Sequence, residues 1–395
     1  MAEAEPAVHQ DQSPPDDARA DRLVTAGPPA AQAGGILTVD LAAIEANWRA
    51  LGRRVMPAEC AAVIKADGYG CGIERVAAAL AKAGCKTFFV ADLAEAGRAR
   101  AVAPEQTIYV LNALLPNTAA AYADLRARPV IGSMVELAEW DAFCNANQWR
   151  GGAALHVDTG MNRLGISAND AAALAHRIRS ENHGITLLMS HLVSAQQPEH
   201  PLNARQIEAF REVRTLYRGI PSSLANSSGI FLGATAHCDV VRPGVALYGV
   251  NPTPGQSNAM QPVIELQAHI VQVRTVPRGE TVGYDAAWTA KRATRIAVVA
   301  VGYADGYLRA ASASDEAPGA DAIVAGQCCT LAGRVSMDLL AIDVTDLPDS
   351  AARRGDLVTL IGGEMTVDAL AGAGGTIGYE VLTGLGRRYH RVYRG

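Results

Sequence analysis

Short apolar runs alternate with longer Ala- and Leu-rich stretches along the chain from residue 36 onward. Near-continuous apolar strands separated by helices are typical of a parallel sheet that helices cover. Eight such units predict an α/β fold, a (β/α)8 barrel of the TIM type, with an open doubly wound sheet as the second possibility. The expected strands span residues 61–66, 87–92, 107–112, 128–133, 153–160, 186–191, 222–227 and 239–244.

The pattern changes after about residue 260. Beyond it, β-rich runs are separated by Gly and Pro turns, and the clearest helical stretch is "TVDALAGAGG" at 366–375. This pattern predicts a mostly antiparallel β domain over residues 263–395, which follows a barrel domain over residues 35–262. The apolar run "GILTVDL" at 35–41 has no place in an eight-strand count, so it is free to pair with the second domain.

Residues 1–34 are rich in Ala, Pro, Asp and Gln and nearly lack large apolar side chains. Such a segment cannot bury enough surface to offset the entropy cost of ordering, so we expect a disordered tail. It has no basic stretch followed by an apolar one, and therefore does not resemble a secretory signal.

Composition and charge narrow the class of protein further. The net charge is −5, which implies no basic face and argues against nucleic acid as the main partner. No uninterrupted apolar run of ~20 residues is present, so we expect no membrane span. The seven cysteines are an odd number without C-x-x-C spacing, which argues against a disulfide framework or a metal site. We therefore expect a soluble cytoplasmic protein.

Polar side chains stand at the ends of several expected strands. Because the carboxyl ends of the strands in such a barrel converge on one face, where these barrels keep their active sites, we expect these side chains to lie together. They are Lys65 and Tyr69 after the first strand, Asp158 and Arg163 after the fifth, Ser190 and His191 after the sixth, Asn226, Ser227 and Ser228 after the seventh, and Arg242 and Gly244 in the eighth.

Lys65 is the first candidate for chemistry. A lysine at the mouth of a barrel can form a Schiff base with a carbonyl compound once burial and nearby cations lower its pKa, although a lone lysine there more often extends to solvent. The loops after strands seven and eight, with Ser227 and the backbone of Gly244 and Val245, are the usual phosphate site of these barrels. Together they indicate a phosphate-bearing aldehyde, and pyridoxal 5′-phosphate (PLP) is that ligand.

Eight motifs in the same order resemble those of bacterial alanine racemases, and the resemblance extends from about residue 36 to the end of the chain. Each motif is weak alone, but their shared order is highly specific. The resemblance implies a homodimer in which each active site combines the PLP-binding barrel of one chain with the β domain of the other. The motifs are "VIKADGYGCG", "VDTGMNRLG", "MSHL", "ANSSG", "VRPGVALYG", "VGYADGY", "GRVSMD" and "TIGYEVLTGLGRRYHRVY".

The resemblance assigns roles to residues around the cofactor. Lys65 matches the lysine that forms the Schiff base and serves as one catalytic base. His191 matches the histidine beside the pyridine ring, and Arg242 matches the arginine that faces the pyridine nitrogen. An arginine stays charged and accepts no proton, so it would leave that nitrogen unprotonated. The phosphate contacts match Tyr69, Ser227, Gly244, Val245 and Tyr379, with Asn226 as a neighbouring polar group.

Tyr303 in "VGYADGY" matches the second catalytic base, which the β domain supplies. Two bases on opposite faces of Cα allow a proton to leave on one side and return on the other. A tyrosine has a free pKa near ~10 that cations or hydrogen bonds must lower, and we expect His191 and Arg242 to provide that positive field. The substrate contacts match Arg163, which also meets the cofactor's phenolic oxygen, the backbone N–H of Met337, and the tyrosines Tyr284 and Tyr379 that narrow the access channel.

Two positions depart from the family pattern. Many members carry a carbamylated lysine seven residues before the arginine that corresponds to Arg163, and its negative charge orients that arginine; here the position is His156. An imidazole cannot form this stable carbamate, so a chloride or a nearby acid replaces it, or Arg163 is less fixed. Gln196 stands where many members have an acidic residue in the access channel, which can alter substrate selectivity.

The sequence therefore predicts a PLP-dependent enzyme that interconverts L-alanine and D-alanine with two bases and supplies D-alanine for peptidoglycan. A broader-specificity amino-acid racemase or a related decarboxylase of the same fold is the first alternative. The lack of an export signal argues against the broad racemase, and Arg242, where decarboxylases would have a carboxylate, argues against the decarboxylase. A non-catalytic PLP-binding protein is the second alternative, but such single-barrel proteins lack the domain that carries Tyr303.

Overall fold

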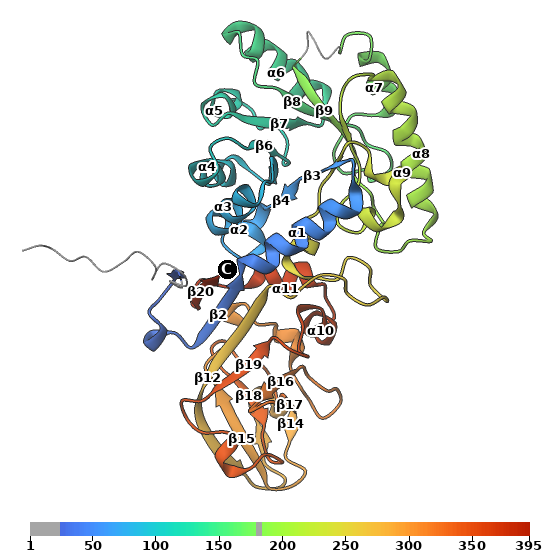
Figure 1. Ribbon diagram of the computed structural model, residues 1–395. Helices are drawn as coiled ribbons and strands as arrows, with labels where there is room; N and C mark the ends of the chain where they lie inside the picture. Colours follow the sequence, from blue (N-terminus) through green and yellow to red (C-terminus); the bar gives the residue numbers. More distant parts are fainter. Residues whose placement is uncertain (1–23, 179–183) are drawn as a thin grey trace, which may run out of the picture.

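The computed structural model describes residues 24–178 and 184–395, which form a barrel with a β domain beneath it (Figure 1). In the barrel part, seven strands pair in parallel in the order β10-β9-β8-β7-β6-β5-β4. Most residues of β4 to β9 are apolar and buried, as expected for a sheet covered on both faces, whereas β10 consists of two buried serines. The strands are β3 (Glu59–Cys60), β4 (Ala62–Val63), β5 (Thr87–Val90), β6 (Thr107–Val110), β7 (Ala127–Ile131), β8 (Ala153–His156), β9 (Ile185–Met189), β10 (Ser222–Ser223) and β11 (Val240–Val241).

The strand β11 closes this sheet into a barrel. It pairs in parallel with β3, and the N–H of Val63 in β4 donates to the carbonyl of Pro243 at 2.9 Å. On its other side, the N–H of Arg242 donates to the carbonyl of Ala225, just beyond β10, at 2.9 Å. Taking β3 and β4 as one interrupted strand gives eight strand positions, so the predicted (β/α)8 barrel is confirmed.

Helices cover the outside of the barrel, with α3 to α6 along one side and α7 to α9 along the other (Figure 1). Several of them begin at a side-chain cap: Asp92 accepts from the N–H of Glu95 at the start of α4, and Ser133 accepts from the N–H of Glu136 at the start of α6. The helices are α1 (Leu41–Val55), α2 (Lys65–Tyr69), α3 (Ile73–Ala83), α4 (Leu93–Val102), α5 (Ala119–Asp124), α6 (Met134–Asn147), α7 (Ala168–Leu174), α8 (Pro201–Leu216) and α9 (Ala234–His237).

The β domain is built on a nine-stranded sheet in which β2 and β20 are the parallel pair and the other described pairs are antiparallel. The prediction of a mostly antiparallel second domain is therefore confirmed. Its strands are β1 (Val24–Ala26), β2 (Gly35–Asp40), β12 (Ile264–Val276), β15 (Thr294–Val299), β16 (Asp321–Val324), β17 (Gln327–Thr330), β18 (Leu340–Asp343), β19 (Leu357–Ile361) and β20 (His390–Arg394), with β13 (Thr281–Val282) and β14 (Trp288–Thr289) as a separate hairpin.

The N-terminal strands belong to this sheet. β2 lies between β12 and β20, with its buried and half-buried residues in strict alternation, so the first apolar run pairs with the β domain. Residues 24–34, which we expected to be part of a disordered tail, instead carry β1, which pairs with the edge of β20. Backbone hydrogen bonds at a sheet edge order this segment without large apolar side chains. Residues 1–23 lie outside the described residues.

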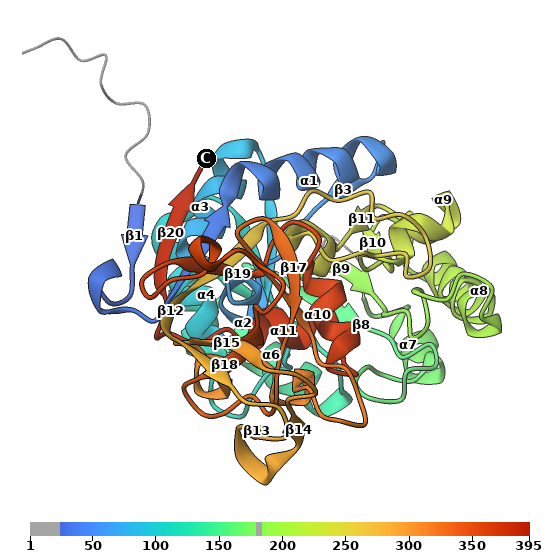
Figure 2. The same ribbon diagram turned by 90° about the horizontal axis from the view of Figure 1, so that it is seen from below.

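A short helix of the β domain packs against the mouth of the barrel. The helix α11 (Gly378–Gly384) follows α10 (Val367–Ala373) in the β domain and lies against α2 at the barrel mouth in both views (Figures 1 and 2). A continuous cluster of buried apolar side chains runs from the barrel into the β domain. Among the helices that the structure describes, none is both long and apolar enough to cross a membrane.

Candidate active site

A cavity of about 430 Å³ lies at the carboxyl ends of the barrel strands. It is lined by residues near or after the ends of β4 and of β6 to β11, together with two residues of α11. Residues far apart in the sequence therefore meet in one site. Of the residues expected there, the cavity brings together Lys65, Tyr69, Arg163, His191, Asn226, Ser227, Arg242, Gly244, Val245 and Tyr379, and it includes His156 as well.

Lys65 lies two residues after the end of β4, in the wall of the cavity. Burial and the nearby Arg163 guanidinium lower the pKa of Lys65, whereas the Glu95 carboxylate acts in the opposite direction. A lower pKa leaves a larger fraction of the amine neutral near pH 7. Because only the neutral amine is a nucleophile and a base, the site favours both kinds of chemistry at Lys65.

Hydroxyl and backbone N–H groups gather around Ser227. Its Oγ accepts hydrogen bonds from the N–H groups of Gly244 (2.9 Å) and Ala246 (3.2 Å). A Cβ built on Gly244 would lie 2.3 Å from the Oη of Tyr69, so glycine is needed for the phenol to approach the backbone. The Tyr69 ring stacks on Tyr248 with centroids 4.6 Å apart, and burial raises the pKa of Tyr69, so its hydroxyl stays protonated as a donor. Such a group of donors suits a phosphate.

Arg242 lies buried inside the barrel. Its guanidinium donates to the carbonyl of Ser190 (2.6 Å) and to the hydroxyl of Ser223, and one of its nitrogens lies 3.4 Å from Nδ1 of His191. Burial lowers the pKa of Arg242 to about 10, which still leaves it charged at neutral pH. Among the residues that the structure describes, no carboxylate lies within ion-pair distance of Arg242. The cavity therefore keeps an uncompensated positive charge.

His156 and His191 are neutral in this site. Burial and the nearby Arg242 lower the pKa of His191 to about 3 and that of His156 to about 4. The expectation that His191 supplies positive charge is therefore wrong, because a buried cation beside it disfavours a second charge. His156, at the position seven residues before Arg163, likewise offers no negative charge.

Arg163 lies on the loop after β8, at the exposed edge of the cavity. The Asp158 carboxylate shapes this loop by accepting hydrogen bonds from the N–H groups of Gly160, Met161 and Asn162, at 2.8 to 2.9 Å. Neither Asp158 nor any other carboxylate within residues 24–178 and 184–395 lies within ion-pair distance of Arg163. The described part of the chain therefore offers no acid to hold this arginine.

The remaining expected residues line a separate cavity on the β domain. Tyr303, Met337 and Tyr284 border a hollow of about 400 Å³ that shares no lining residue with the barrel cavity. Their exposed fractions are 40 %, 53 % and 69 %. The N–H of Ala304 donates to the carbonyl of Met337 at 2.9 Å, which holds the Tyr303 turn against the methionine segment. A single chain therefore does not bring Lys65 and Tyr303 into one cavity.

Family models match nearly the whole described chain. A model of the N-terminal domain of alanine racemase matches residues 39–252, and a model of its C-terminal domain matches residues 263–393. The chain belongs to the alanine racemase family. The alanine racemase of Methylobacterium sp. (strain 4-46) is 54 % identical over 360 residues, which cover 91 % of this chain and 98 % of the relative. The alanine racemase of Rhizobium meliloti (strain 1021) is 46 % identical over 368 residues, with 91 % and 96 % covered.

Solved structures of alanine racemases share this fold. The alanine racemase from Bartonella henselae with covalently bound pyridoxal phosphate has a TM-score of 0.85 at 35 % identity, covering 92 % of this chain and 100 % of the relative. The biosynthetic alanine racemase from Pseudomonas aeruginosa has a TM-score of 0.85 at 37 % identity, with the same coverage. The likeness to alanine racemases thus includes both the barrel and the β domain.

Two polar residues of the barrel cavity were not expected from the alanine racemase motifs. Asn112 lies two residues after β6, so the rule that polar residues at strand ends line the site would have found it. Thr383 lies one turn after Tyr379 on α11, and its hydroxyl donates to the carbonyl of Tyr379 at 2.8 Å. No sequence pattern indicates Thr383, because it reaches the barrel from the other domain.

The two neutral histidines predict how stability depends on pH. In the unfolded chain each imidazole has a pKa of 6.5, whereas in the fold the pKa is about 4 for His156 and about 3 for His191. Between pH 6.5 and 4 the unfolded chain binds protons that the folded chain does not. The free energy of unfolding therefore falls as the pH falls, by up to about 1.4 kcal/mol per pH unit for each histidine. Urea unfolding at several pH values between 6.5 and 4 measures this dependence. In His156→Gln the free energy of unfolding should fall less steeply with falling pH than in the wild type, and an equal dependence on pH would contradict the pKa assigned to His156.

Proposed function

We propose that this protein interconverts L-alanine and D-alanine, with PLP as its cofactor. The observation that carries the proposal is the meeting of the Lys65 amine, the donors around Ser227 and the unpaired Arg242 in one barrel cavity. Its support is the 54 % identity to an alanine racemase over 91 % of the chain.

The barrel cavity fits PLP at each of its functional groups. The Tyr69 and Ser227 hydroxyls suit the phosphate, since both can donate to an anion, and the N–H of Gly244 holds the Ser227 hydroxyl by donating to its Oγ. Lys65 suits the aldehyde, because its lowered pKa favours the neutral amine. Arg242 suits an unprotonated pyridine nitrogen, because a guanidinium donates and cannot accept. When bound, PLP supplies an electron sink that weakens the Cα–H bond of an attached amino acid.

Within this site the chain itself positions the substrate and moves protons. Lys65 removes or returns a proton on one face of Cα, and the Tyr303 hydroxyl does so on the other. Arg163 and the backbone N–H of Met337 bind the substrate carboxylate. Neutral His191 would lie beside the cofactor ring, and its 3.4 Å contact with Arg242 supports the orientation of that arginine.

A second copy of the chain completes the site in this proposal. Tyr303 and Met337 of one protomer would enter the barrel cavity of its partner, and Tyr284 and Tyr379 would narrow the channel between them. The support is that the two cavities of one chain share no residue. Exposed apolar groups around them, such as Leu164 and Met337, are also of the kind that a partner covers.

We place this reaction in the cytoplasm, where its D-alanine would serve peptidoglycan synthesis. All seven cysteines are free, which is usual for proteins of a reducing compartment. No nucleic acid takes part in the proposed reaction.

Chiral chromatography of amino acids incubated with the purified protein and PLP tests the function. We expect L-alanine and D-alanine each to reach an equal mixture, because enantiomers have equal free energies. Amino acids with one or more additional methylene groups should react at least about tenfold more slowly. Equal rates across the panel would instead indicate a broad-specificity racemase. PLP uptake without racemisation of any amino acid would indicate a non-catalytic PLP-binding protein.

A further inference from the structure

Residues 66–70, which directly follow Lys65, have left-handed backbone conformations. The first four belong to α2, and Gly70 follows it. Glycine adopts this conformation freely, but a residue with a Cβ meets its own carbonyl oxygen there, which costs free energy. Three of the five carry a Cβ, so contacts from outside must hold the turn. The φ angles are 53° at Ala66, 55° at Asp67, 61° at Gly68, 52° at Tyr69 and 78° at Gly70.

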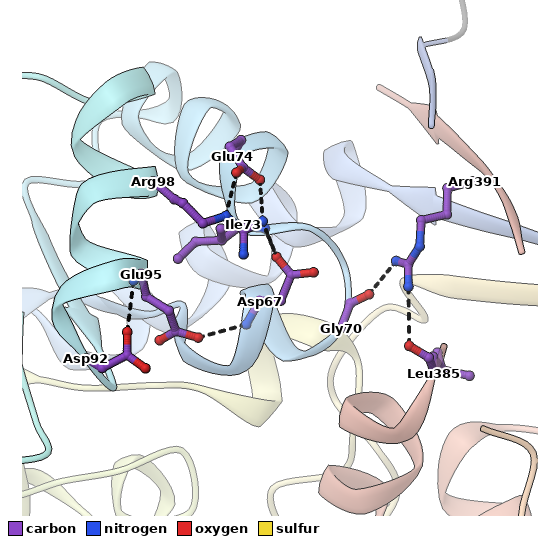
Figure 3. A network of polar contacts seen from close by, with 9 residues as sticks. All are labelled: Asp67, Gly70, Ile73, Glu74, Asp92, Glu95, Arg98, Leu385 and Arg391. Atoms are coloured by element: carbon purple, nitrogen blue, oxygen red, sulfur yellow. Dashed lines mark hydrogen bonds and ion pairs between the residues drawn. The ribbon is translucent and has the colours of Figure 1, made fainter. Parts of the chain in front are cut away.

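Arg98 and its acidic partners hold the first half of this turn from α3 and α4 (Figure 3). The Asp67 Oδ1 accepts a hydrogen bond from Arg98 at 2.6 Å and another from the N–H of Ile73 at 3.1 Å. Arg98 also donates twice to Glu74 on α3, at 2.6 and 2.7 Å. One turn before Arg98, Glu95 accepts from the N–H of Asp67 at 3.0 Å. Asp67 is therefore fixed at both its carboxylate and its backbone.

The second half of the turn is held by the β domain. Buried Arg391 in β20 donates to the carbonyl of Gly70 at 2.5 Å, and also to the carbonyls of Gly386 (3.0 Å) and Leu385 (3.3 Å). A Cβ on Gly70 would lie 2.2 Å from the carbonyl oxygen of Leu382. Backbone hydrogen bonds at 2.9 Å, from the N–H of Gly68 to the carbonyl of Ile64 and from the N–H of Gly70 to that of Ala66, also hold the turn. The contacts of Asp67 add the side-chain support of its first half.

These charged side chains do not touch the cavity. Lys65, Ala66 and Tyr69 line it, whereas Asp67 and Arg98 do not. The turn is thus the spacer between the amine and the phenol, and its shape sets their relative positions. The side chains of Arg98 and Asp67 are 39 % and 36 % exposed, so their ion pair contributes little to the stability of the whole fold.

We propose that Arg98 is a positioning residue for the cofactor: by binding Asp67 it keeps residues 66–70 left-handed and so fixes the spacing of Lys65 and Tyr69 that PLP requires. This inference rests on the proposed function, which assigns the aldehyde to Lys65 and the phosphate to Tyr69. Without Arg98, the non-glycine residues of the turn relax toward right-handed or extended conformations. The amine and the phenol then fit one PLP molecule poorly, although the protein remains folded.

Titration of the PLP-free protein with PLP, followed by the absorbance of the lysine-linked cofactor, tests the proposal. Arg98→Ala should bind PLP about tenfold or more weakly, as expected for the loss of a charge-assisted hydrogen bond. Its unfolding midpoint without PLP should change little. Arg100→Ala is the matched control, because Arg100 lies on the same helix. Within the described residues it donates only to carbonyls outside the turn, among them those of Pro104, Gln106 and Leu125. It should retain wild-type PLP affinity even if the protein becomes less stable.

Two further variants separate positioning from general damage. Asp67→Asn keeps the shape of the side chain but loses its charge, so it should weaken PLP binding in the same direction as Arg98→Ala. Adding Ala66→Gly to Arg98→Ala removes a Cβ from the left-handed turn and should recover part of the lost affinity. Wild-type affinity in Arg98→Ala, or no recovery with Ala66→Gly, would overturn the inference and leave the proposed function intact. A wild-type protein that forms no lysine-linked PLP would overturn the proposed function itself.

Discussion

A Lys65→Ala variant should lose its covalent link to PLP and at least about 10⁴-fold of its racemase activity. The effect is large because one amine both attaches the cofactor and moves the proton on one face of Cα. Among the described residues no other lysine lines the barrel cavity, so no second amine can replace it. Borohydride reduction followed by mass measurement would detect the link, and chiral chromatography would measure the activity.

Lys82→Ala is a suitable control for this prediction. Lys82 is exposed near the end of α3 and does not line the cavity, so its removal should affect neither the link nor the rate. Covalent PLP that persists in Lys65→Ala, or disappears in Lys82→Ala, would show that Lys65 is not the attachment point.

The barrel and its strand-end residues could be predicted because buried strands are recognisable in the sequence as short apolar runs. Every residue of β5 is buried, and the strand reads as the apolar run "TFFV". Against such runs, Lys65 and Arg242 stand out as charges where apolar side chains are the rule. Their placement at the strand ends follows from the fold, since the ends of parallel strands meet at one face.

The turn after Lys65 could be predicted only in part. Gly68 and Gly70 indicate a tight bend, but the left-handed conformation also includes Ala66, Asp67 and Tyr69, which no composition rule predicts. The contacts that hold these residues come from Arg98, 31 residues from Asp67, and from Arg391, 321 residues from Gly70. Neither separation corresponds to a local pattern, so tertiary structure alone places these arginines beside the turn.

Protonation states were also beyond the sequence. The sequence leads to the expectation that His191, together with Arg242, provides a positive field for Tyr303. Burial and the nearby Arg242 instead lower the pKa of His191 to about 3 and leave it neutral. Whether the pKa of an imidazole rises or falls depends on how deeply it is buried and on the charges beside it, and a sequence motif contains neither.

A Tyr303→Phe variant should racemise alanine about 10²- to 10⁴-fold more slowly while binding PLP as tightly as the wild type. The substitution removes only the hydroxyl that transfers the proton on one face of Cα. Tyr303 lines the β-domain cavity and not the barrel cavity, so the proposed PLP contacts remain. Since Lys65 still exchanges the proton on its own face, one enantiomer of alanine should take up deuterium from D₂O without inverting. NMR would follow the exchange, and chiral chromatography the inversion.

Tyr307→Phe provides a matched control within the same segment. Tyr307 is buried four residues further along, and its hydroxyl has no hydrogen-bond partner within the described residues. Removing this hydroxyl should leave the rate unchanged, because it cannot reach a proton on the substrate. If Tyr303→Phe were as fast as the wild type, or if both variants slowed equally, proton transfer by the Tyr303 hydroxyl would be excluded. The second base would then have to come from another residue of the β-domain cavity, where Tyr284 carries the other phenol.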